Sequence, residues 1–269
     1  MAATTIGGTL PDGSVAPIGD VLVWSGEDDA KDTILPRFVA AGGDRERIYI
    51  VHGTLSNGVK RSFDPSTDIP ALIRAARELP NLKMIVIDPV VLVLPAKSDS
   101  HNNAETRRGL QPLVDLAEER RIVLIGVTHF TKGTVGKDPI ERVTGSLAFG
   151  ALPRIIMGAS ADDDGIQRRL VRIASNIGPS GGGFEYILFQ APLPEHDFSA
   201  QRIQWGAQLR GSAQELLEAT KRSAEGEATA FLLQFLSNGQ KAQREVKDAA
   251  EAHCHSWGTI RRAQKKPRH

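Results

Sequence analysis

Short apolar runs alternate with longer amphipathic segments over the first half of the chain. The runs are rich in β-branched residues and too short to make good helices: 21–25, 48–51, 82–88 and 122–127. The segments between them have helical periodicity: 27–41, 69–79 and 103–120. Strands that alternate with helices predict an α/β fold with a largely parallel sheet and crossover helices.

The second half of the chain has a different pattern. Apolar runs near residues 155–157, 169–173 and 184–189 follow one another without helices between them, which predicts an antiparallel extension. After about Pro192 strand-forming residues become scarce, so we predict a linker followed by helix over 193–222. Residues 223–269 are helical in pattern and increasingly basic, which predicts a small separate module after a core over 1–192.

Composition narrows the class of protein only slightly. The chain has 269 residues, enough for one large domain and an appendage, and its net charge of +1 excludes a wholly basic nucleic-acid binder. Cys254 is the only cysteine, so we expect no intrachain disulfide and a reducing compartment. Since no apolar run reaches the ~20 residues of a bilayer span and the N-terminus lacks a signal-peptide pattern, we expect a cytoplasmic protein without membrane contact.

Three predicted strands end in polar residues: Glu27, Asp88 and His129. The carboxyl ends of parallel strands meet at one edge of a sheet, so these side chains are expected to converge. Their types suit metal–phosphate chemistry, in which Asp88 holds Mg²⁺, Glu27 polarises an attacking water and His129 senses the γ-phosphate. The alternative is that acids beginning a helix, Glu27 above all, are ordinary N-terminal caps.

Several motifs in register resemble one family. Val21–Asp29, Ile85–Pro89, Thr128–Gly133, Arg142–Ser146 and Ser175–Pro179 are similar to motifs of the RecA-like ATPases in the hexameric RepA-type helicase group. The resemblance covers roughly residues 5–190. It implies a RecA-like core that binds ATP and Mg²⁺, forms a homo-oligomeric ring and couples hydrolysis to movement on single-stranded DNA. Similar proteins occur on phages and other mobile elements, often beside primases, so a primase is an expected partner.

The resemblance also implies roles for individual residues. It places Glu27 at the catalytic glutamate, Asp88 at the Walker B acid and His129 at the γ-phosphate sensor. Arg154 falls on the arginine finger that reaches a neighbouring subunit's ATP, a role that suits a fixed guanidinium. Arg154 can equally be a surface arginine before a strand, and the other candidates for the finger are Arg142 and Arg172.

The chain departs from the family pattern in two respects. Ala174 stands where many relatives have a lysine, and a phosphate loop of the form Gly-x4-Gly-Lys-Ser/Thr is missing. Gly53 and Gly58 have the right spacing, but Val59 follows them instead of the lysine. We therefore expect weak ATP binding by this chain alone, and apolar sheet edges left unpaired by the absent first strand. A shortened reading frame is the favoured explanation over an evolved nucleotide-free protein.

The C-terminal segment resembles the helix-turn-helix tail of many relatives. Helices are predicted over 228–236 and 242–250, and a third begins at Ser256-Trp257. The predicted DNA-binding residues, on single-stranded or duplex origin DNA, are Trp257, Thr259, Arg261, Arg262, Lys265 and Lys266. The alternative is a solvated basic terminus.

The sequence thus leads to an ATPase core of a RepA-like replicative helicase with a DNA-binding tail. The rival hypothesis is a non-hydrolysing DNA-binding or assembly protein on a degenerate RecA-like scaffold. A regulatory ATPase without strand-separating activity is the third.

Overall fold

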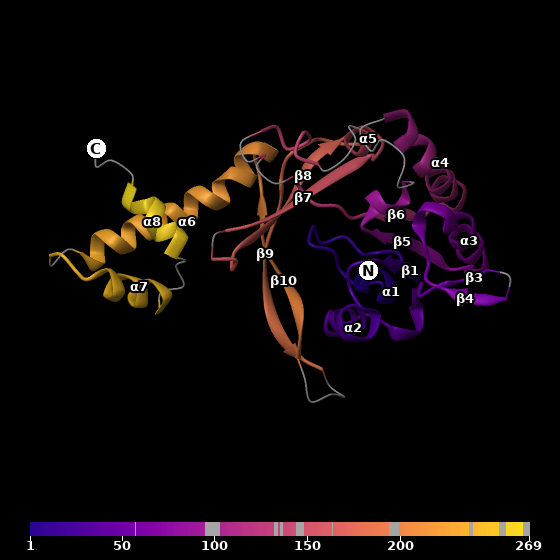
Figure 1. Ribbon diagram of the computed structural model, residues 1–269, viewed down its shortest axis with the longest axis horizontal. Helices are drawn as coiled ribbons and strands as arrows, with labels where there is room; N and C mark the ends of the chain where they lie inside the picture. The colour runs from indigo at the N-terminus through magenta and orange to yellow at the C-terminus, as the bar shows by residue number, and fades with distance from the viewer. Residues whose placement is uncertain are drawn as a thin grey trace. The chain divides into compact units, whose positions relative to one another are not determined.

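The computed structural model describes the chain in two units (Figure 1). The described residues are 1–269 apart from 57, 95–102, 132–133, 135–136, 144–147, 163, 194–198, 237–238, 253–256 and 266–269. The first unit comprises Met1–Pro153 and Phe189–Ile203, and the second comprises Arg154–Leu188 and Gln204–His269.

A four-stranded parallel sheet forms the centre of the first unit. Its order is β2 (Ile48–Ile50), β1 (Asp20–Ser25), β5 (Leu82–Asp88) and β6 (Val123–Gly126), and all neighbours pair in parallel. Each strand lies within a residue or two of its predicted range. The predicted parallel sheet is therefore confirmed.

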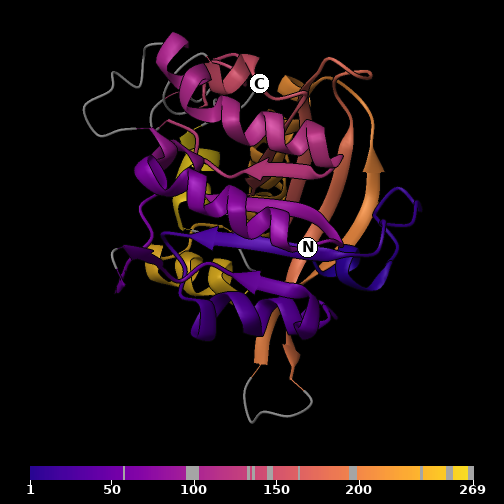
Figure 2. The same ribbon diagram turned by 90° about the vertical axis from the view of Figure 1, so that its right-hand side faces the viewer.

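Helices connect and cover these strands (Figure 2). They are α1 (Ala2–Ile6), the π-helical turn η1 (Ala30–Ile34) that continues into α2 (Leu35–Ala40), α3 (Pro65–Glu78), α4 (Asn103–Arg120) and α5 (Ala148–Ala151). Two short 3-10 turns, η2 (Arg45–Arg47) and η3 (Val90–Val93), and a small hairpin of β3 (Thr54–Ser56) and β4 (Val59–Arg61) complete the unit. Gly42 follows the end of α2 with a φ of 83°, in the left-handed region that favours glycine.

The two inner strands of this sheet are covered on both faces. Ile85 and Ile87 of β5 pack in the main core with Leu72 of α3 and Leu113 of α4, while Val86 packs on the other side with Val21 and Val23. A strand buried on both faces reads as a continuous apolar run, which explains the 82–88 pattern.

Strand β6 lies at the edge of this sheet and differs from the inner strands. Its Val123 and Ile125 keep 51% and 37% of their surface exposed. β6 therefore presents apolar side chains at an edge of the sheet.

The hairpin of β3 and β4 is fastened to α3 by one ion pair. Arg61 donates two hydrogen bonds to the Asp68 carboxylate, Nη1 to Oδ2 at 2.7 Å and Nη2 to Oδ1 at 2.6 Å. Asp68 also accepts a hydrogen bond from the Asp64 backbone N–H at 2.9 Å. The Arg61 guanidinium, followed by that N–H bond, holds the pKa of the Asp68 carboxyl below its ordinary value.

The second unit contains most of an antiparallel sheet, as predicted. Its order is β10 (Ser199–Leu209), β9 (Gly183–Pro192), β8 (Arg168–Ser175) and β7 (Ile155–Ala161), with β7–β8 and β8–β9 antiparallel. The ends of β9 and β10 next to residues 194–198 belong to the first unit, where Ala191 and Ala200 pack with Ala40.

The expected linker at the start of 193–222 is wrong, because the eleven-residue strand β10 occupies Ser199–Leu209. Its partner β9 supplies the hydrogen bonds, and most of its side chains are exposed, so it needs no continuous apolar run. The second half of that range is helical as predicted, since α6 (Ala213–Phe235) begins there with a capping box between Ser212 and Glu215. The division at 222/223 falls inside α6.

Two further helices follow α6 in the second unit: α7 (Gln243–Ala252) and α8 (Trp257–Lys265). Leu232 of α6, Val246 and Ala250 of α7, and Ile260 of α8 form a small buried cluster. The structure thus has helices where three C-terminal helices were predicted. Within the described part of the chain, none of the helices combines the length and the apolarity that crossing a bilayer requires.

Candidate functional site

Asp88 stands at the carboxyl end of β5, directly beside the end of β1. It pairs in register with Ser25, and its carbonyl accepts a hydrogen bond from the Gly26 N–H at 2.7 Å. The ladder between the two inner strands therefore runs to their last residues. The Asp88 side chain is delivered at the edge where parallel sheets bind ligands.

Glu27 follows β1 by two residues and does not cap the helix after it. The cap of the turn η1 is Asp29, whose side chain accepts hydrogen bonds from the backbone of Lys31 and Asp32 at 2.7 and 2.9 Å. The backbone N–H groups of Glu27 and Asp28 instead donate to Ser25 Oγ at 3.3 and 3.0 Å. The Glu27 carboxylate is therefore not an N-cap, so helix capping does not explain why an acid stands at this position.

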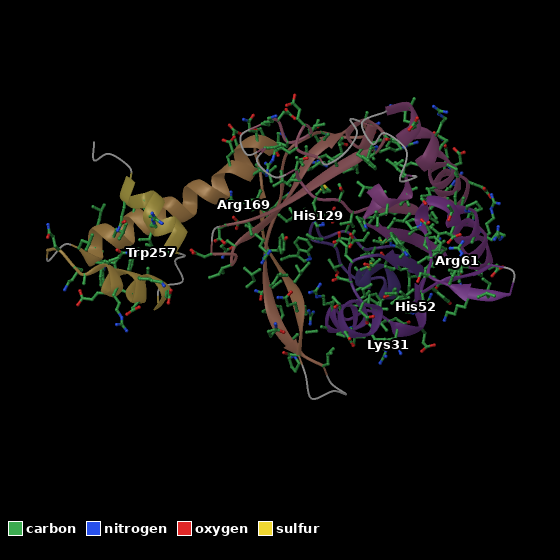
Figure 3. All side chains as sticks on the ribbon, viewed as in Figure 1. Lys31, His52, Arg61, His129, Arg169 and Trp257 are labelled. Atoms are coloured by element: carbon green, nitrogen blue, oxygen red, sulfur yellow. The ribbon has the colours of Figure 1, made fainter. Side chains whose placement is uncertain are left out.

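His129 comes to the same edge from the end of β6 (Figure 3). Figure 3 labels His129. Its Nε2 lies 3.3 Å from Glu27 Oε2, although the two residues are 102 positions apart in the chain. Backbone hydrogen bonds hold the segment before it, with Val127 N–H donating to Ile87 C=O at 2.9 Å and Val90 N–H to Val127 C=O at 2.8 Å. The structure therefore brings Glu27 and His129 into contact at the end of the sheet where Asp88 stands.

The electrostatics of this edge are dominated by carboxylates. Burial raises the pKa of the Asp88 carboxyl above its ordinary value, and the nearby charges of Glu27 and Asp28 raise it further. His129 acts in the opposite direction. Crowded carboxylates favour the binding of a cation, because its charge relieves their repulsion.

The carboxylates at this edge are suitable ligands for a Mg²⁺ ion that is bound together with a nucleotide. In such sites Mg²⁺ keeps several waters and is held by one or two carboxylates together with substrate phosphates. Among the residues that the structure describes, no group of three or more His, Cys, Asp or Glu side chains could hold a metal on its own. Asp88, with Glu27 and Asp28 nearby, matches the carboxylate share of a phosphate-bound Mg²⁺.

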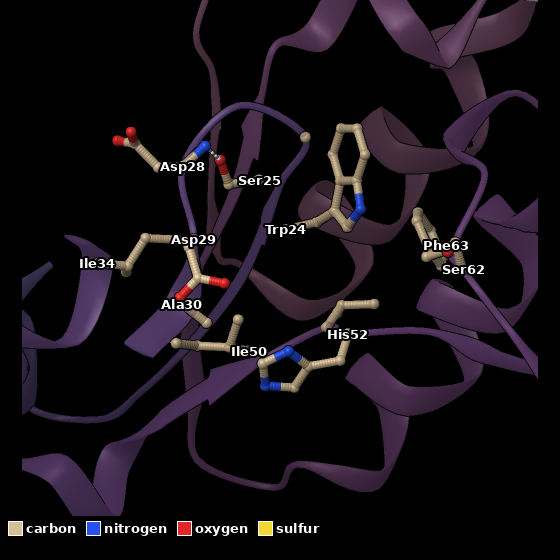
Figure 4. Close-up of a pocket in the computed structure, with 12 residues that line it drawn as sticks. Trp24, Ser25, Asp28, Asp29, Ala30, Ile34, Ile50, His52, Ser62 and Phe63 are labelled. Atoms are coloured by element: carbon tan, nitrogen blue, oxygen red, sulfur yellow. Dashed lines mark hydrogen bonds between the residues drawn. The ribbon is translucent and has the colours of Figure 1, made fainter. Parts of the chain in front are cut away.

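A cavity of about 270 Å³ opens beside this cluster, over the ends of β1 and β2 (Figure 4). Its lining includes Trp24, Asp28, Asp29, His52 and Phe63, but none of Glu27, Asp88 and His129. The cavity is therefore distinct from the predicted cluster. His52 had no pattern around it in the sequence that pointed to a site.

The three candidate arginines lie in different settings. Arg154 is exposed immediately before β7 in the second unit, and its carbonyl accepts a hydrogen bond from the Asn176 N–H at 3.0 Å. Arg172 Nε donates to the Gly181 carbonyl at 3.3 Å. The Arg142 guanidinium stacks 4.3 Å from the centre of the Phe130 ring, next to His129 in the chain. The role of Arg154 as a finger stays a prediction.

The predicted DNA-binding residues lie on α8 and just beyond it. Trp257 is partly buried and packs against the cluster of α6, α7 and α8, while Arg261 is exposed. The side chains of Thr259, Arg262 and Lys265 lie outside the described part of the structure, and so does Lys266. The phosphate-contacting role of this tail stays a prediction.

Comparison with known proteins places the first unit in a family. A family model for an AAA domain matches residues 1–135, which is half of the chain. The chain therefore belongs to this AAA-domain family, which is in accord with a RecA-like P-loop ATPase. No curated protein matches the chain.

Solved structures with detectable similarity are distant. One is a DnaB-like replicative helicase described with its interactions with primase, at a TM-score of 0.49 and 16% identity, covering 64% of this chain and 50% of that one. Another is the RadB recombinase, at a TM-score of 0.42 and 16% identity, covering 64% of this chain and 76% of that one. The match spans only half the length of the helicase chain.

Proposed function

We propose that this chain carries the carboxylate half of an ATP-hydrolysing site in a RepA-like replicative helicase. The observation that supports this most directly is the 3.3 Å contact between His129 Nε2 and Glu27 Oε2 at the sheet edge that also holds Asp88. Three separate strands contribute one polar group each, in the order that the family motifs require. Membership in the AAA-domain family agrees with it.

Each residue of the cluster has a distinct task in this proposal. Asp88 holds the Mg²⁺ that accompanies ATP, and the metal neutralises charge on the phosphates. Glu27 orients the attacking water and accepts its proton, for which an exposed carboxylate at the strand end is suited. His129 contacts Glu27. If His129 binds the γ-phosphate of ATP instead, the Glu27 carboxylate loses this contact and can change position, so His129 acts as the sensor of the γ-phosphate.

The remaining parts of the proposal come from the resemblance. They are a homo-oligomeric ring in which Arg154 acts as the finger, translocation on single-stranded DNA, a primase partner, and a tail that binds single-stranded or duplex origin DNA. The sequence has no Gly-x4-Gly-Lys-Ser/Thr motif. In a phosphate loop, the backbone N–H groups of this motif bind the phosphates of the nucleotide. We accordingly expect weak ATP affinity for this chain by itself.

Calorimetric titration with ATP, in Mg²⁺ and in EDTA, tests the proposal. We expect weak binding that needs Mg²⁺, is abolished by Asp88→Ala and survives Glu27→Gln, because Glu27 acts on water and not on the nucleotide. Asp115→Asn, an exposed carboxylate on α4, is the matched control and leaves binding unchanged. ATP binding that persists in EDTA, or in Asp88→Ala, would contradict the role of Asp88.

The second candidate is a non-hydrolysing DNA-binding or assembly protein on the same scaffold. The missing phosphate loop and Ala174, in place of a lysine, favour it. It predicts no Mg²⁺-dependent heat in the wild-type protein together with intact DNA binding. The titration therefore separates the two hypotheses.

A further inference from the structure

Three aromatic rings lie together on one face of the antiparallel sheet. Trp205 of β10 contacts Phe184 and Tyr186 of β9, with ring centroids 6.2 and 5.5 Å apart and interplanar angles of 75° and 54°. Phe184 and Tyr186 are two positions apart on one strand, so they point to the same side. We call the side of the sheet that carries these three rings the aromatic face.

The opposite face of the same sheet is occupied by α6. Val171 of β8 is fully buried, and Arg169 Nη1 donates a hydrogen bond to the Leu216 carbonyl of α6 at 3.1 Å. Arg169 also pairs with Glu185 of β9 at 3.6 Å on that side. The packing contacts that hold α6 therefore lie on this face, and Trp205, on the aromatic face, keeps 38% of its surface exposed.

The aromatic face carries cations and no strand carboxylate. Arg168 lies directly opposite Tyr186 in the register of β8 and β9, and Arg172 follows on the same side. The only acidic residue in the four strands is Glu185, which lies on the other face. The Nε atom of Arg168 is buried and has no hydrogen-bond partner among the described residues, so this guanidinium has a donor still to be satisfied.

The exposed ring of Trp205 and the partly buried rings of Phe184 and Tyr186 lie on the same face as guanidinium groups, which matches the chemistry of unpaired nucleotides. Bases of a single strand stack on aromatic side chains whatever their sequence, and arginines bind the phosphates between them. A duplex keeps its bases stacked on one another and cannot offer them to Trp205. We infer that the aromatic face binds single-stranded nucleic acid, with bases stacking on Trp205 and Tyr186 and a phosphate held by Arg168.

This inference rests on the proposed helicase function, because it names the surface that binds the single-stranded nucleic acid on which a helicase acts. This binding needs no nucleotide, however, because the face is built from the antiparallel sheet alone. Binding measured without ATP therefore tests the face, while the titration with ATP tests the carboxylate cluster. Either result can fail while the other holds.

Fluorescence anisotropy with the full chain and a labelled oligothymidylate of about 15 nucleotides, within the range of single-strand sites, is the direct test. We expect Trp205→Ala to weaken binding about tenfold, as the loss of one stacked base does, and Trp205→Phe to recover most of the affinity. Tyr49→Ala removes an equally exposed aromatic ring from β2 in the other sheet and should leave binding unchanged.

The role of Arg168 has its own readout. Arg168→Gln should weaken binding and reduce the slope of log affinity against log salt by about one, as expected for one lost phosphate contact. Arg202→Gln is the control, since Arg202 is exposed on β10 and its odd spacing from Trp205 places it on the opposite face. Oligouridylate in a parallel titration distinguishes RNA from DNA as the bound strand.

Three outcomes would overturn the inference. The first is unchanged affinity in Trp205→Ala, and the second is equal affinity for a duplex of the same length. The third is a Trp205→Ala variant that loses binding only because its oligomeric state changes in size-exclusion chromatography, which would show that the face packs against protein. Circular dichroism of each variant checks that lost binding does not come from unfolding.

Discussion

The two sheets of this protein present chemistry in different places. In the parallel sheet β1 and β5 are buried on both faces, so only the strand ends can offer polar groups, and Asp88 and Glu27 appear there. In the antiparallel sheet one face is covered by α6 and the other carries Trp205 and Arg168 along the length of the strands. How much of a sheet is covered thus decides whether its edge or its face can bind a ligand.

The difference extends to charge. The carboxyl edge of the parallel sheet gathers acids, which suits a metal ion, while the strands of the antiparallel sheet hold four arginines, Arg168, Arg169, Arg172 and Arg202, against the single acid Glu185. Substitutions in each sheet can test whether the two sheets differ in stability and in chemistry in this way.

The largest effect is expected in the doubly covered strand β5. Ile85 is 1% exposed, so Ile85→Ala leaves a cavity and should lower the free energy of unfolding of the first unit by about 3 to 4 kcal/mol. Urea denaturation followed by Trp24 fluorescence, in a background of Trp205→Phe and Trp257→Phe, reports on this unit alone. Val123→Ala on the exposed edge strand is the control, with a change within about 0.5 kcal/mol; equal losses in both would remove the distinction between inner and edge strands.

The ion pair that fastens the small hairpin to α3 should come next. Asp68→Ala removes two charge-assisted hydrogen bonds from Arg61 and one from the Asp64 N–H, which is expected to cost about 2 kcal/mol. The cost stays moderate because the Arg61 side chain is 43% exposed and its charge can be hydrated. The same Trp24 assay measures it, with Asp115→Ala as control, and a change below about 0.5 kcal/mol would show that the hairpin is held by other contacts.

In the second unit the start of α6 depends on its capping box. Ser212 Oγ accepts from the Glu215 N–H, and the Glu215 carboxylate accepts from the Ser212 N–H. Ser212→Ala should lower stability by about 1 kcal/mol, and Ser212→Asp should retain most of it. Thermal unfolding followed by Trp205 fluorescence, in a background of Trp24→Phe and Trp257→Phe, measures the effect. An Asp variant as unstable as the Ala variant would contradict capping as the cause.

The smallest effect is a pH-dependent one at the carboxylate cluster. The pKa of Asp88 is raised in the folded state, so the ionised side chain opposes folding above that pKa and this cost disappears below the ordinary carboxyl pKa. Asp88→Asn should therefore raise stability at pH 7 by less than about 1 kcal/mol, with the difference falling toward zero in acid. Melting temperatures of both proteins across pH test this, and a difference that does not vary with pH would contradict the electrostatic cause.

The sequence predicts some strands well and others poorly for a physical reason. β5 was predictable because burial on both faces demands an apolar run that ends at Asp88. β10 was missed because most of its side chains are exposed, so little restricts their composition. A signal was nevertheless present, since Ile203, Trp205, Ala207 and Leu209 alternate with Gln or other residues at a period of two.

Part of the candidate site could also be predicted from the sequence. The order of strand ends predicted that Glu27 and His129 would meet, and the structure places them 3.3 Å apart. The sequence does not decide which of Asp28 and Asp29 caps the following turn, because aspartate is a preferred N-cap residue and both positions are available; the structure uses Asp29. The aromatic face depends on the pairing of β9 with β10, which local sequence patterns do not specify.

The continuity of α6 bears on how the C-terminal helices can be separated from the rest. At 1.5 Å per residue its 23 residues span about 35 Å, with Leu216 and Leu217 buried near one end and Ala228 and Leu232 in the C-terminal cluster near the other. A truncation at residue 222 would cut this helix in the middle, but it would leave Ala228 and Leu232 together with their partners on α7 and α8. Cleavage between Leu236 and Gln243 would keep the helix whole, but removing α7 and α8 would expose Ala228 and Leu232. The C-terminal half of α6 therefore belongs structurally with the two helices that follow it.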